Sequence, residues 1–482
     1  MNLKQKAASG IKWSAVSTGA ITFFQFITLA VLARILSPSD FGLMGMVMVV
    51  IGFANLFADM GISKAIIYRQ DSTKSELSSL YWLNIIAGTS VFLIINSIAP
   101  LIVSFYHEER LLVLIHYSSL AFLISPFGQQ FQILMQKELQ FNKLSKIEIG
   151  GSFVNSIIAI ILAFSGVGVL SLVYGQLFGA VFRSIILLFW GWNHWRPSFH
   201  FSKNDLKGYL GFGLYQMGEK SINYFNSNLD YLLIGSLLGA KSLGYYNLAS
   251  NLVLKPSALI NPILTKVAFP IFSKIQNDIE KLKRGYLKVL QILSNINFPI
   301  MIGLAITAPN IVPVIFGDKW IPSIVLVQIL AFVGLLRSTG NPTGALLLAQ
   351  GRADLGFKWN VGIFITQTIG LYIGARSGSM IGVAVAVLIM QIIYTLFNYI
   401  FLIRTALGNC LKEYFFSMWP ALWISASMGV SVYIVGILLR SLNTFVLLTI
   451  EIVTGIIIYL VINLLYQRNF LNEMKSTLFA KA

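Results

Sequence analysis

Apolar runs of 20 or more residues recur along this chain from end to end. Runs of this length are typical of helices that span a membrane. Composition agrees with a hydrocarbon surrounding, because only 11% of the 482 residues are charged and the mean hydropathy is +0.76. A soluble domain has about 25% charged residues. We therefore expect an all-α polytopic membrane protein. A lone cysteine, Cys410, excludes an intrachain disulfide, and no metal-type Cys/His spacing is present.

The apolar runs predict fourteen transmembrane helices. Their limits are 13–35, 42–67, 80–105, 111–136, 149–165, 169–192, 208–238, 243–272, 286–309, 323–349, 359–374, 380–403, 418–439 and 444–466.

Lysine and arginine in the connecting segments predict the orientation. With the N-terminus in the cytoplasm, the inner loops and tails hold 22 of the 35 cations and the outer loops hold five. Cytoplasmic loops carry such an excess of cations. We expect both termini in the cytoplasm, and we attribute most of the net charge of +17 to a basic inner face beside anionic lipid. Because the cations are spread thinly over every inner loop, we expect no nucleic-acid partner.

Eight cations remain inside the predicted spans, and four of them fall near the middle of a helix: Arg183, Lys220, Lys255 and Arg337. A charge at the bilayer centre costs about 2.5–3.5 kcal/mol even on the lenient insertion scale. These four side chains should therefore face protein or water. Four acids also lie inside the spans, namely Asp59, Glu219, Asp230 and Glu451.

The segment "QMGEKSINYFNSNLDYLLIG" (216–235) is unusually polar for a membrane helix. At 100° per residue, its polar side chains fall within an arc of about 80°; they are Gln216, Glu219, Asn223, Asn226 and Asp230. This stripe is typical of the wall of a hydrated cavity. The alternative is a set of hydrogen bonds between helices, with Glu219 and Lys220 paired at the interface.

The chain contains an internal repeat. "RILSPSDFGLMGM" (34–46) and "SLLGAKSLGYYNL" (236–248) align without gaps at an offset of 202 residues, and each joins an odd to an even helix on the outer side. The offset corresponds to six helices, so we expect two six-helix lobes, 1–202 and 203–405, followed by helices 13 and 14 and a cytoplasmic tail in 406–482. Substrate sites in transporters built from repeats lie between the halves.

These features together resemble a known family. Fourteen helices in this arrangement, "ARILSPSDFGLMGM" after the first helix, "DYLLIGSLLGAKSLGYYNLA" after the polar stripe and the proline-broken "KPSALINPILTKVAFPIF" are similar to the polysaccharide-transporter flippases. Those proteins belong to the MOP exporter superfamily, and the likeness is strongest to the colanic-acid and teichuronic-acid exporter branch. The resemblance implies a V-shaped two-lobe fold and alternating access.

The same resemblance implies translocation of an undecaprenyl-pyrophosphate-linked glycan from the inner to the outer leaflet, for teichuronic acid or an exopolysaccharide. A large anionic cargo suits a wet, cationic chamber, and arginine suits pyrophosphate through bidentate contacts. We therefore expect the four mid-span cations to bind substrate. Asp59, Glu219 and Asp230 are candidates for a proton or sodium site, and no other cofactor is expected. Other expected partners are membrane lipids and glycan-polymerising machinery, with the monomer as the functional form.

Three other functions stay open at this stage. A cation-coupled drug exporter of the same superfamily would favour an acidic cavity, whereas cations outnumber acids here by eight to four within the spans. A lipid II flippase differs only in cargo. A glycan polymerase is the least favoured, because no long outer loop with histidine or paired carboxylates is present, and we expect no enzymatic activity. No Walker A pattern occurs either.

Overall fold

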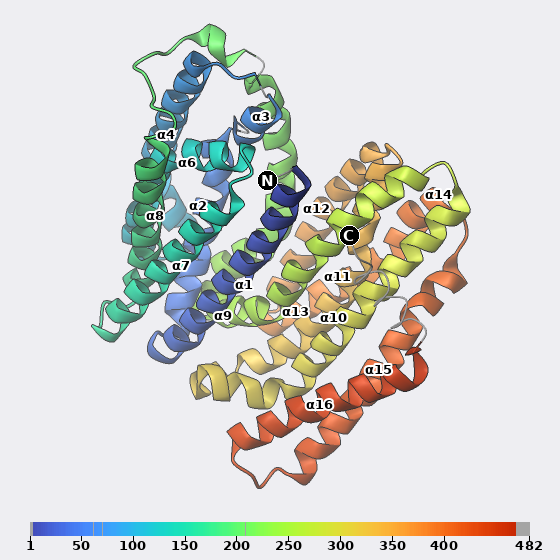
Figure 1. Cartoon of the computed structure of the whole chain (residues 1–482). Coiled ribbons are helices and arrows are strands. Elements are labelled where there is room, and N and C mark those ends of the chain that lie inside the picture. Colours follow the sequence, from blue (N-terminus) through green and yellow to red (C-terminus); the bar gives the residue numbers. More distant parts are fainter. Residues whose placement is uncertain (1–2, 61, 70, 208, 469–482) are drawn as a thin grey trace. The chain divides into compact units, whose positions relative to one another are not determined.

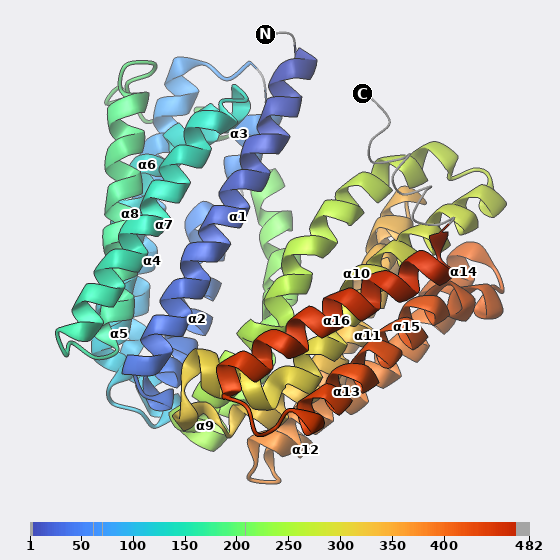
Figure 2. The ribbon, with the colours of Figure 1, turned by 60° about the horizontal axis from the view of Figure 1, so that its bottom comes forward.

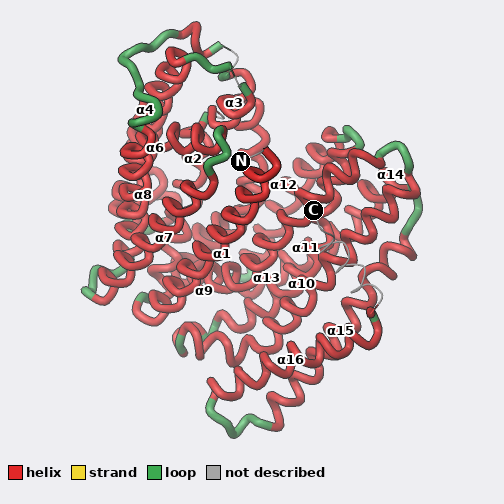
Figure 3. The backbone as a smooth tube through the Cα atoms, in the orientation of Figure 1, coloured by secondary structure: helices red, strands yellow, loops and turns green. Residues whose placement is uncertain are grey.

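The described chain is built from helices and short connections (Figures 1 and 3). The computed structural model describes residues 3–60, 62–69, 71–207 and 209–468. The chain divides into two compact units, Met1–Gly244 and Tyr245–Ala482. The expected all-α membrane architecture is confirmed, because eleven helices among the described residues are long and apolar enough to cross a bilayer. The predicted number of fourteen stays a prediction.

The described residues of the N-terminal unit form eight helices and a 3₁₀ turn, and α9 begins in this unit. The bounds are α1 Leu3–Ile35, α2 Pro38–Asp59, α3 Ile62–Tyr68, α4 Lys74–Tyr106, α5 Leu111–Ser119, α6 Ala121–Lys137, α7 Phe141–Phe164, α8 Leu170–Gly191, η1 Lys203–Leu206 and α9 Leu210–Ile275. Helix α7 packs between α1 and α8, and α6 packs between α4 and α8. Helices α4 and α6 contribute to two buried hydrophobic clusters of this unit, which α3 and η1 complete on one side and α7 and α8 on the other.

The C-terminal unit takes the second half of α9 and the remaining helices. Their bounds are α10 Ile279–Phe316, η2 Asp318–Trp320, α11 Ser323–Ala349, α12 Ala353–Ala375, α13 Met380–Phe397, the π-helix η3 Asn398–Ile403, α14 Arg404–Leu407, α15 Leu411–Leu438 and α16 Thr444–Tyr466. Helix α10 packs against α11, α15 and α16. Figure 2 shows α10, α15 and α16 running alongside one another.

Helix α9 covers two of the predicted spans. Its backbone leaves the helical conformation at Gly239, where φ is 78° and ψ is 175°. A positive φ is accessible to glycine without steric cost. The break separates the predicted helices 208–238 and 243–272. Contacts group the first of these with the N-terminal unit, whereas the repeat groups it with the second lobe, so the predicted lobe limits stay a prediction.

A capping box starts α2 in the first copy of the repeated turn. The Ser37 hydroxyl accepts the backbone N–H of Asp40 at 3.3 Å, and the Asp40 carboxylate accepts the backbone N–H of Ser37 at 2.9 Å. Pro38 follows at the start of the helix, where a missing N–H is tolerated. The helix ends at Asp59 and is followed by Met60 in the left-handed conformation, with φ of +45°. The run predicted as a single helix over 42–67 is therefore two helices, α2 and α3.

The two copies of the repeated turn pack against each other. A Cβ added to Gly42 would lie 1.7 Å from the carbonyl oxygen of Ala240, and one added to Gly244 would lie 1.8 Å from the carbonyl oxygen of Pro38. Pro38 and Gly42 correspond to Ala240 and Gly244 at the offset of 202 residues. Such reciprocal contacts are the mark of a two-fold relationship. The repeat is therefore a structural pair in which both crossing points need glycine.

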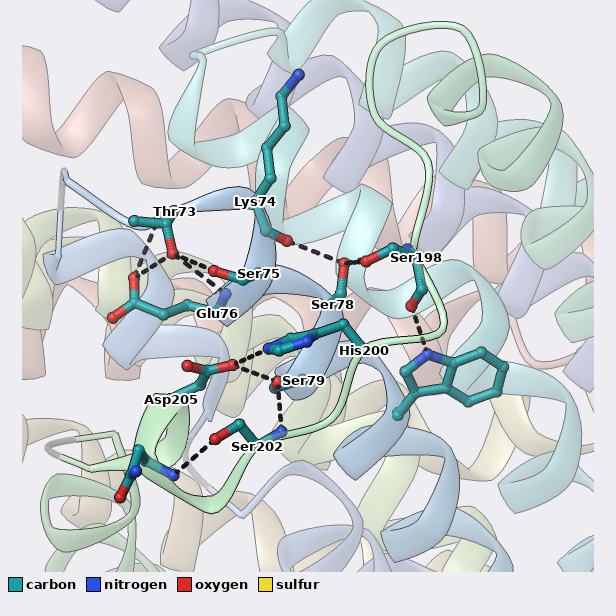
Figure 4. A network of polar contacts seen from close by, with 12 residues as sticks. Thr73, Lys74, Ser75, Glu76, Ser78, Ser79, Ser198, His200, Ser202 and Asp205 are labelled. Atoms are coloured by element: carbon teal, nitrogen blue, oxygen red, sulfur yellow. Dashed lines mark hydrogen bonds and ion pairs between the residues drawn. The ribbon is translucent and has the colours of Figure 1, made fainter.

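The loop between α8 and α9 is tied to the first turns of α4 (Figure 4). The Ser79 hydroxyl donates to Asp205 Oδ2 at 2.6 Å, and His200 Nε2 lies 3.0 Å from the same oxygen. The backbone N–H of Ser198 donates to the Ser78 hydroxyl at 3.1 Å. These contacts come from a loop that is remote in sequence from α4, and they fix where α9 begins within the N-terminal unit.

Candidate functional site

A polar cavity of about 420 Å³ lies inside the N-terminal unit, between α2, α3, α6 and α8. Arg183 is the one charged residue among the described side chains that line it. The other polar lining residues are Asn55, Ser63, Ser125, Gln129, Gln132, Gln136 and Ser184. A space of this size surrounded by amides and hydroxyls has room and hydrogen-bond partners for water.

Helix α6 supplies half of this polar wall. Ser125, Gln129, Gln132 and Gln136 follow one another at spacings of four, three and four residues, so they share one face of the helix. This stripe is absent from the sequence-based prediction, although the helical spacing that indicates the stripe of 216–230 also indicates this one. Its amides are uncharged, whereas the predicted binding residues were selected by their charge within the membrane spans.

Arg183 lies in the middle of α8 and is half-buried. Its aliphatic stem crosses Gly151 of α7, where an added Cβ would lie 2.5 Å from Arg183 Cγ. The guanidinium makes no ion pair or hydrogen bond with the described residues. A guanidinium carries five N–H donors in a fixed fork. No described residue accepts a hydrogen bond from these donors, and Arg183 lines the cavity.

Among the described residues, the charged group that acts on Arg183 through space is Glu148 of α7. Glu148 Oε2 accepts a hydrogen bond from the Ser17 hydroxyl of α1 at 3.2 Å. Glu148 lies just before the predicted helix 149–165, but α7 begins at Phe141 and brings it inside the helix. Glu148 offsets part of the field of Arg183 without occupying its donors, which leaves a binding group for an anion.

The other three predicted cations do not line this cavity. Lys220 lies half-buried on the first half of α9 in the N-terminal unit. Lys255 lies on the second half of α9 and Arg337 at the middle of α11, and both are exposed within the C-terminal unit. The structure thus brings only Arg183 into the polar cavity of the N-terminal unit.

The exposed face that carries Arg337 is held by a buried polar network. The Thr343 hydroxyl donates to Asn398 Oδ1 at 3.1 Å and lies 3.1 Å from the hydroxyl of Tyr286. These contacts join α11 to the π-helix η3 and to α10. Asn341 follows Arg337 one turn later and is also exposed. The network therefore holds the buried face of this part of α11, whereas Arg337 and Asn341 lie on its exposed face.

The predicted stripe on α9 is partly described. Asn223 is exposed, Asn226 and Asp230 are half-buried, and Leu229 is only 6% exposed. The backbone N–H of Tyr231 donates to Asp230 Oδ1 at 3.0 Å. The side chains of three further predicted residues lie outside the described residues: Gln216, Glu219 and Asp59.

Tyr224 anchors this half of α9 to α2. Its hydroxyl lies 3.1 Å from the carbonyl oxygen of Met48 and 2.9 Å from that of Val49, so it can donate to either. An added Cβ at Gly52 would lie 2.3 Å from the same hydroxyl. Tyr224 is not predicted from the sequence, because its role depends on partners 175 and 176 residues earlier in the chain. Among the described residues, no three His, Cys, Asp or Glu side chains form a group that could hold a metal ion.

Comparison with known proteins gives consistent similarities. The family model described as "Polysaccharide biosynthesis protein" matches residues 31–325. The chain is 38% identical to the lipopolysaccharide biosynthesis protein WzxC of Escherichia coli K12 over 91% of this chain and 89% of that protein. It is 35% identical to the teichuronic acid biosynthesis protein TuaB of Bacillus subtilis 168 over 95% of each chain. Among solved structures, the lipid II flippase MurJ in an inward closed conformation matches with a TM-score of 0.76, 16% identity and coverage of 96% of this chain and 100% of that one. This last likeness concerns the fold.

Proposed function

Because the chain belongs to the polysaccharide biosynthesis protein family, we propose that it is a flippase that moves a lipid-linked glycan from the inner to the outer leaflet of the cytoplasmic membrane. The cargo in this proposal is an undecaprenyl-pyrophosphate-linked glycan of anionic character, destined for a surface polysaccharide such as teichuronic acid or an exopolysaccharide. The relatives named for lipopolysaccharide and teichuronic acid biosynthesis support this assignment. A transporter has no need of catalytic groups, and we propose no enzymatic step.

The observation that carries the proposal is the polar cavity around Arg183. Its amide and hydroxyl lining suits sugar hydroxyls, and its guanidinium has free donors for a phosphate or uronate oxygen. Glu148 lies close enough to act on the guanidinium through space and makes no direct ion pair with it. An apolar cargo would gain nothing from such a lining. This combination therefore favours a hydrophilic anion over a cationic drug.

Lys220, Lys255 and Arg337 complete the proposed set of substrate-binding cations. Exposure of Lys255 and Arg337 on mid-helix surfaces supports this role, since a cation in the middle of a membrane helix is expensive unless it faces water or an anion. Coupling to a proton or sodium gradient through Asp59, Glu219 or Asp230 is part of the proposal. We further propose that both termini are cytoplasmic, that the monomer is active and that glycan-polymerising machinery receives the product.

The proposal is tested by export of the glycan in cells that lack their own copy of the protein. Arg183→Ala should reduce export by about 10–100-fold, because a hydrogen bond to a charged group contributes about 1.5–3 kcal/mol. Arg183→Lys should retain part of the activity, because it keeps the charge without the bidentate geometry. Normal export by Arg183→Ala at equal protein level would refute a role for this cavity in cargo binding.

A matched control separates cargo binding from folding. Arg376→Ala removes an exposed cation beyond the end of α12, whose guanidinium donates to the Tyr372 hydroxyl at 3.0 Å, and should leave export unchanged. The competing cargo is lipid II. Rescue of lipid II translocation by this chain, without rescue of surface polysaccharide, would assign it the other cargo.

A further inference from the structure

A second carboxyl group, outside the cavity of Arg183, lies buried in the C-terminal unit. Glu451 of α16 is only 4% exposed. Its Oε1 accepts a hydrogen bond from Asn310 Nδ2 of α10 at 2.8 Å and lies against Gly436 of α15. Its Oε2 is buried and has no hydrogen-bond partner in the part of the chain that the structure describes. One oxygen of this acid is thus satisfied and the other is not.

The segments of α10 and α15 that pack on α16 carry no cation that could neutralise the charge of an ionised Glu451. Between residues 289 and 316 of α10 and between 414 and 438 of α15 there is no Lys, Arg, His, Asp or Glu, and α16 has no other charged residue. The titratable groups on these segments are tyrosines. Tyr459 also lines the cavity described next, but its hydroxyl donates to the Asn295 carbonyl at 2.6 Å, and Tyr433 is 61% exposed. Arg440 lies in the turn before α16 and forms no ion pair with Glu451.

The carboxyl borders an apolar cavity of about 390 Å³ between α10, α15 and α16, three helices that lie together in Figure 2. Its lining is almost wholly aliphatic, and Glu451, Thr307 and Tyr459 are the polar residues in it. The Thr307 hydroxyl is already committed, because it donates to the Gly303 carbonyl at 2.8 Å. An ionised carboxylate with one bare oxygen in such surroundings is strongly disfavoured relative to the neutral acid.

We propose that Glu451 is a proton-binding site that keeps its proton at neutral pH, and that the apolar cavity beside it admits hydrophobic reagents to the acid. The neutral acid makes an uncharged contact with Asn310 and so joins α16 to α10. Release of the proton would leave a bare charge among three helices. The packing of the C-terminal helix pair on α10 is thereby linked to protonation of one residue. This inference does not depend on the nature of the cargo.

A hydrophobic carbodiimide is a direct probe of such a group. The acid transfers its proton to a carbodiimide nitrogen, and the resulting carboxylate oxygen bonds to the central carbon, which gives an O-acylisourea with no leaving group. An exposed glutamate with a pKa of about 4.3 holds a proton in roughly one molecule in 500 at pH 7. Such a residue is a poor target, whereas a protonated buried acid is a good one.

The experiment treats the purified full-length protein in detergent with dicyclohexylcarbodiimide and locates the adduct by peptide mass spectrometry over a range of pH. We expect labelling of Glu451 at neutral pH to exceed that of the exposed Glu413 by at least about tenfold, and to fall as the pH rises into the alkaline range. Glu451→Gln should abolish the adduct, while the control Glu413→Gln should leave it unchanged. Failure of Glu451 to react at any pH would overturn the proposal.

Thermal unfolding gives a second, independent readout. A glutamine is neutral and keeps the acceptor for Asn310, so Glu451→Gln should unfold at the same temperature as the wild type at neutral pH. In alkaline solution the wild type should become the less stable of the two. A loss of stability in Glu451→Gln at neutral pH would mean that the ionised carboxylate is the native form, which contradicts the proposal.

Discussion

Replacing Gly42 by alanine should weaken the contact between the two copies of the repeated turn. The new Cβ would lie 1.7 Å from the Ala240 carbonyl oxygen, and real Cβ contacts are essentially never shorter than 3.0 Å. The backbones must therefore separate by at least about 1.3 Å, and neither partner is a flexible side chain that could give way. Over-packing costs about 1–3 kcal/mol, and contact between two backbones puts Gly42→Ala near 3 kcal/mol. Denaturant unfolding in micelles, followed by tryptophan fluorescence, measures this loss.

The reciprocal geometry makes a sharper claim about Gly244. Gly244→Ala should cost about as much as Gly42→Ala, because its Cβ meets the Pro38 carbonyl oxygen at 1.8 Å. In the double variant the second alanine enters a crossing that is already open. The double variant should therefore lose about 1–3 kcal/mol less unfolding free energy than the two single variants lose together.

The matched control is Gly19→Ala, where an added Cβ meets nothing within 4 Å. Alanine should stabilise this helical position by up to about 1 kcal/mol. Single variants at the crossing that unfold like the wild type, or strictly additive losses in the double variant, would refute the reciprocal contact.

Three further predictions concern accessibility and charge. In a Cys410→Ser background, a cysteine replacing Asn223 should react with a small water-soluble thiol reagent at least about tenfold faster than one replacing Leu229, which is only 6% exposed; equal rates would mean that the α9 stripe does not face water. Arg337→Ala should abolish glycan export while Arg337→Lys retains part of it, because the exposed guanidinium has no neighbouring acid in its helix. Normal export by Arg337→Ala at equal protein level would show that the residue is dispensable. Arg440→Ala is the control and should leave export unchanged. Native Cys410 should resist alkylation at neutral pH and react faster as the pH rises, because its side chain is fully buried and burial raises the pKa of its thiol; labelling as fast as in the denatured protein would contradict this.

Much of the helical architecture follows from local sequence. Apolar runs of membrane-spanning length place most helices, the Ser37 capping box marks the start of α2, and the glycine at 239 marks the break in α9. The family expected from the repeated turns is confirmed by the relatives. These features are predictable because length, capping and positive φ are properties of a few consecutive residues.

The candidate site was predicted only in part, because it depends on contacts between remote segments. Arg183 was found from its charge. The position of Glu148 beside it depends on α7 beginning earlier than hydropathy indicates, and the amide wall of α6 carries no charge that would draw attention. The left-handed Met60 that divides α2 from α3 leaves no clear mark in the apolar pattern. Side chains that meet across helices are therefore the part that sequence reasoning misses.

Translocation by the purified protein tests the central claim most directly. The protein is reconstituted into liposomes that carry a radiolabelled undecaprenyl-pyrophosphate-linked anionic glycan, and the share of glycan open to an external hydrolase is followed with time. We predict that transfer between leaflets requires the protein and is slowed about 10–100-fold in Arg183→Ala, while Arg376→Ala transfers at the wild-type rate. Transfer no faster than in protein-free liposomes, with the protein shown to be folded, would contradict the assignment as a lipid-linked glycan flippase.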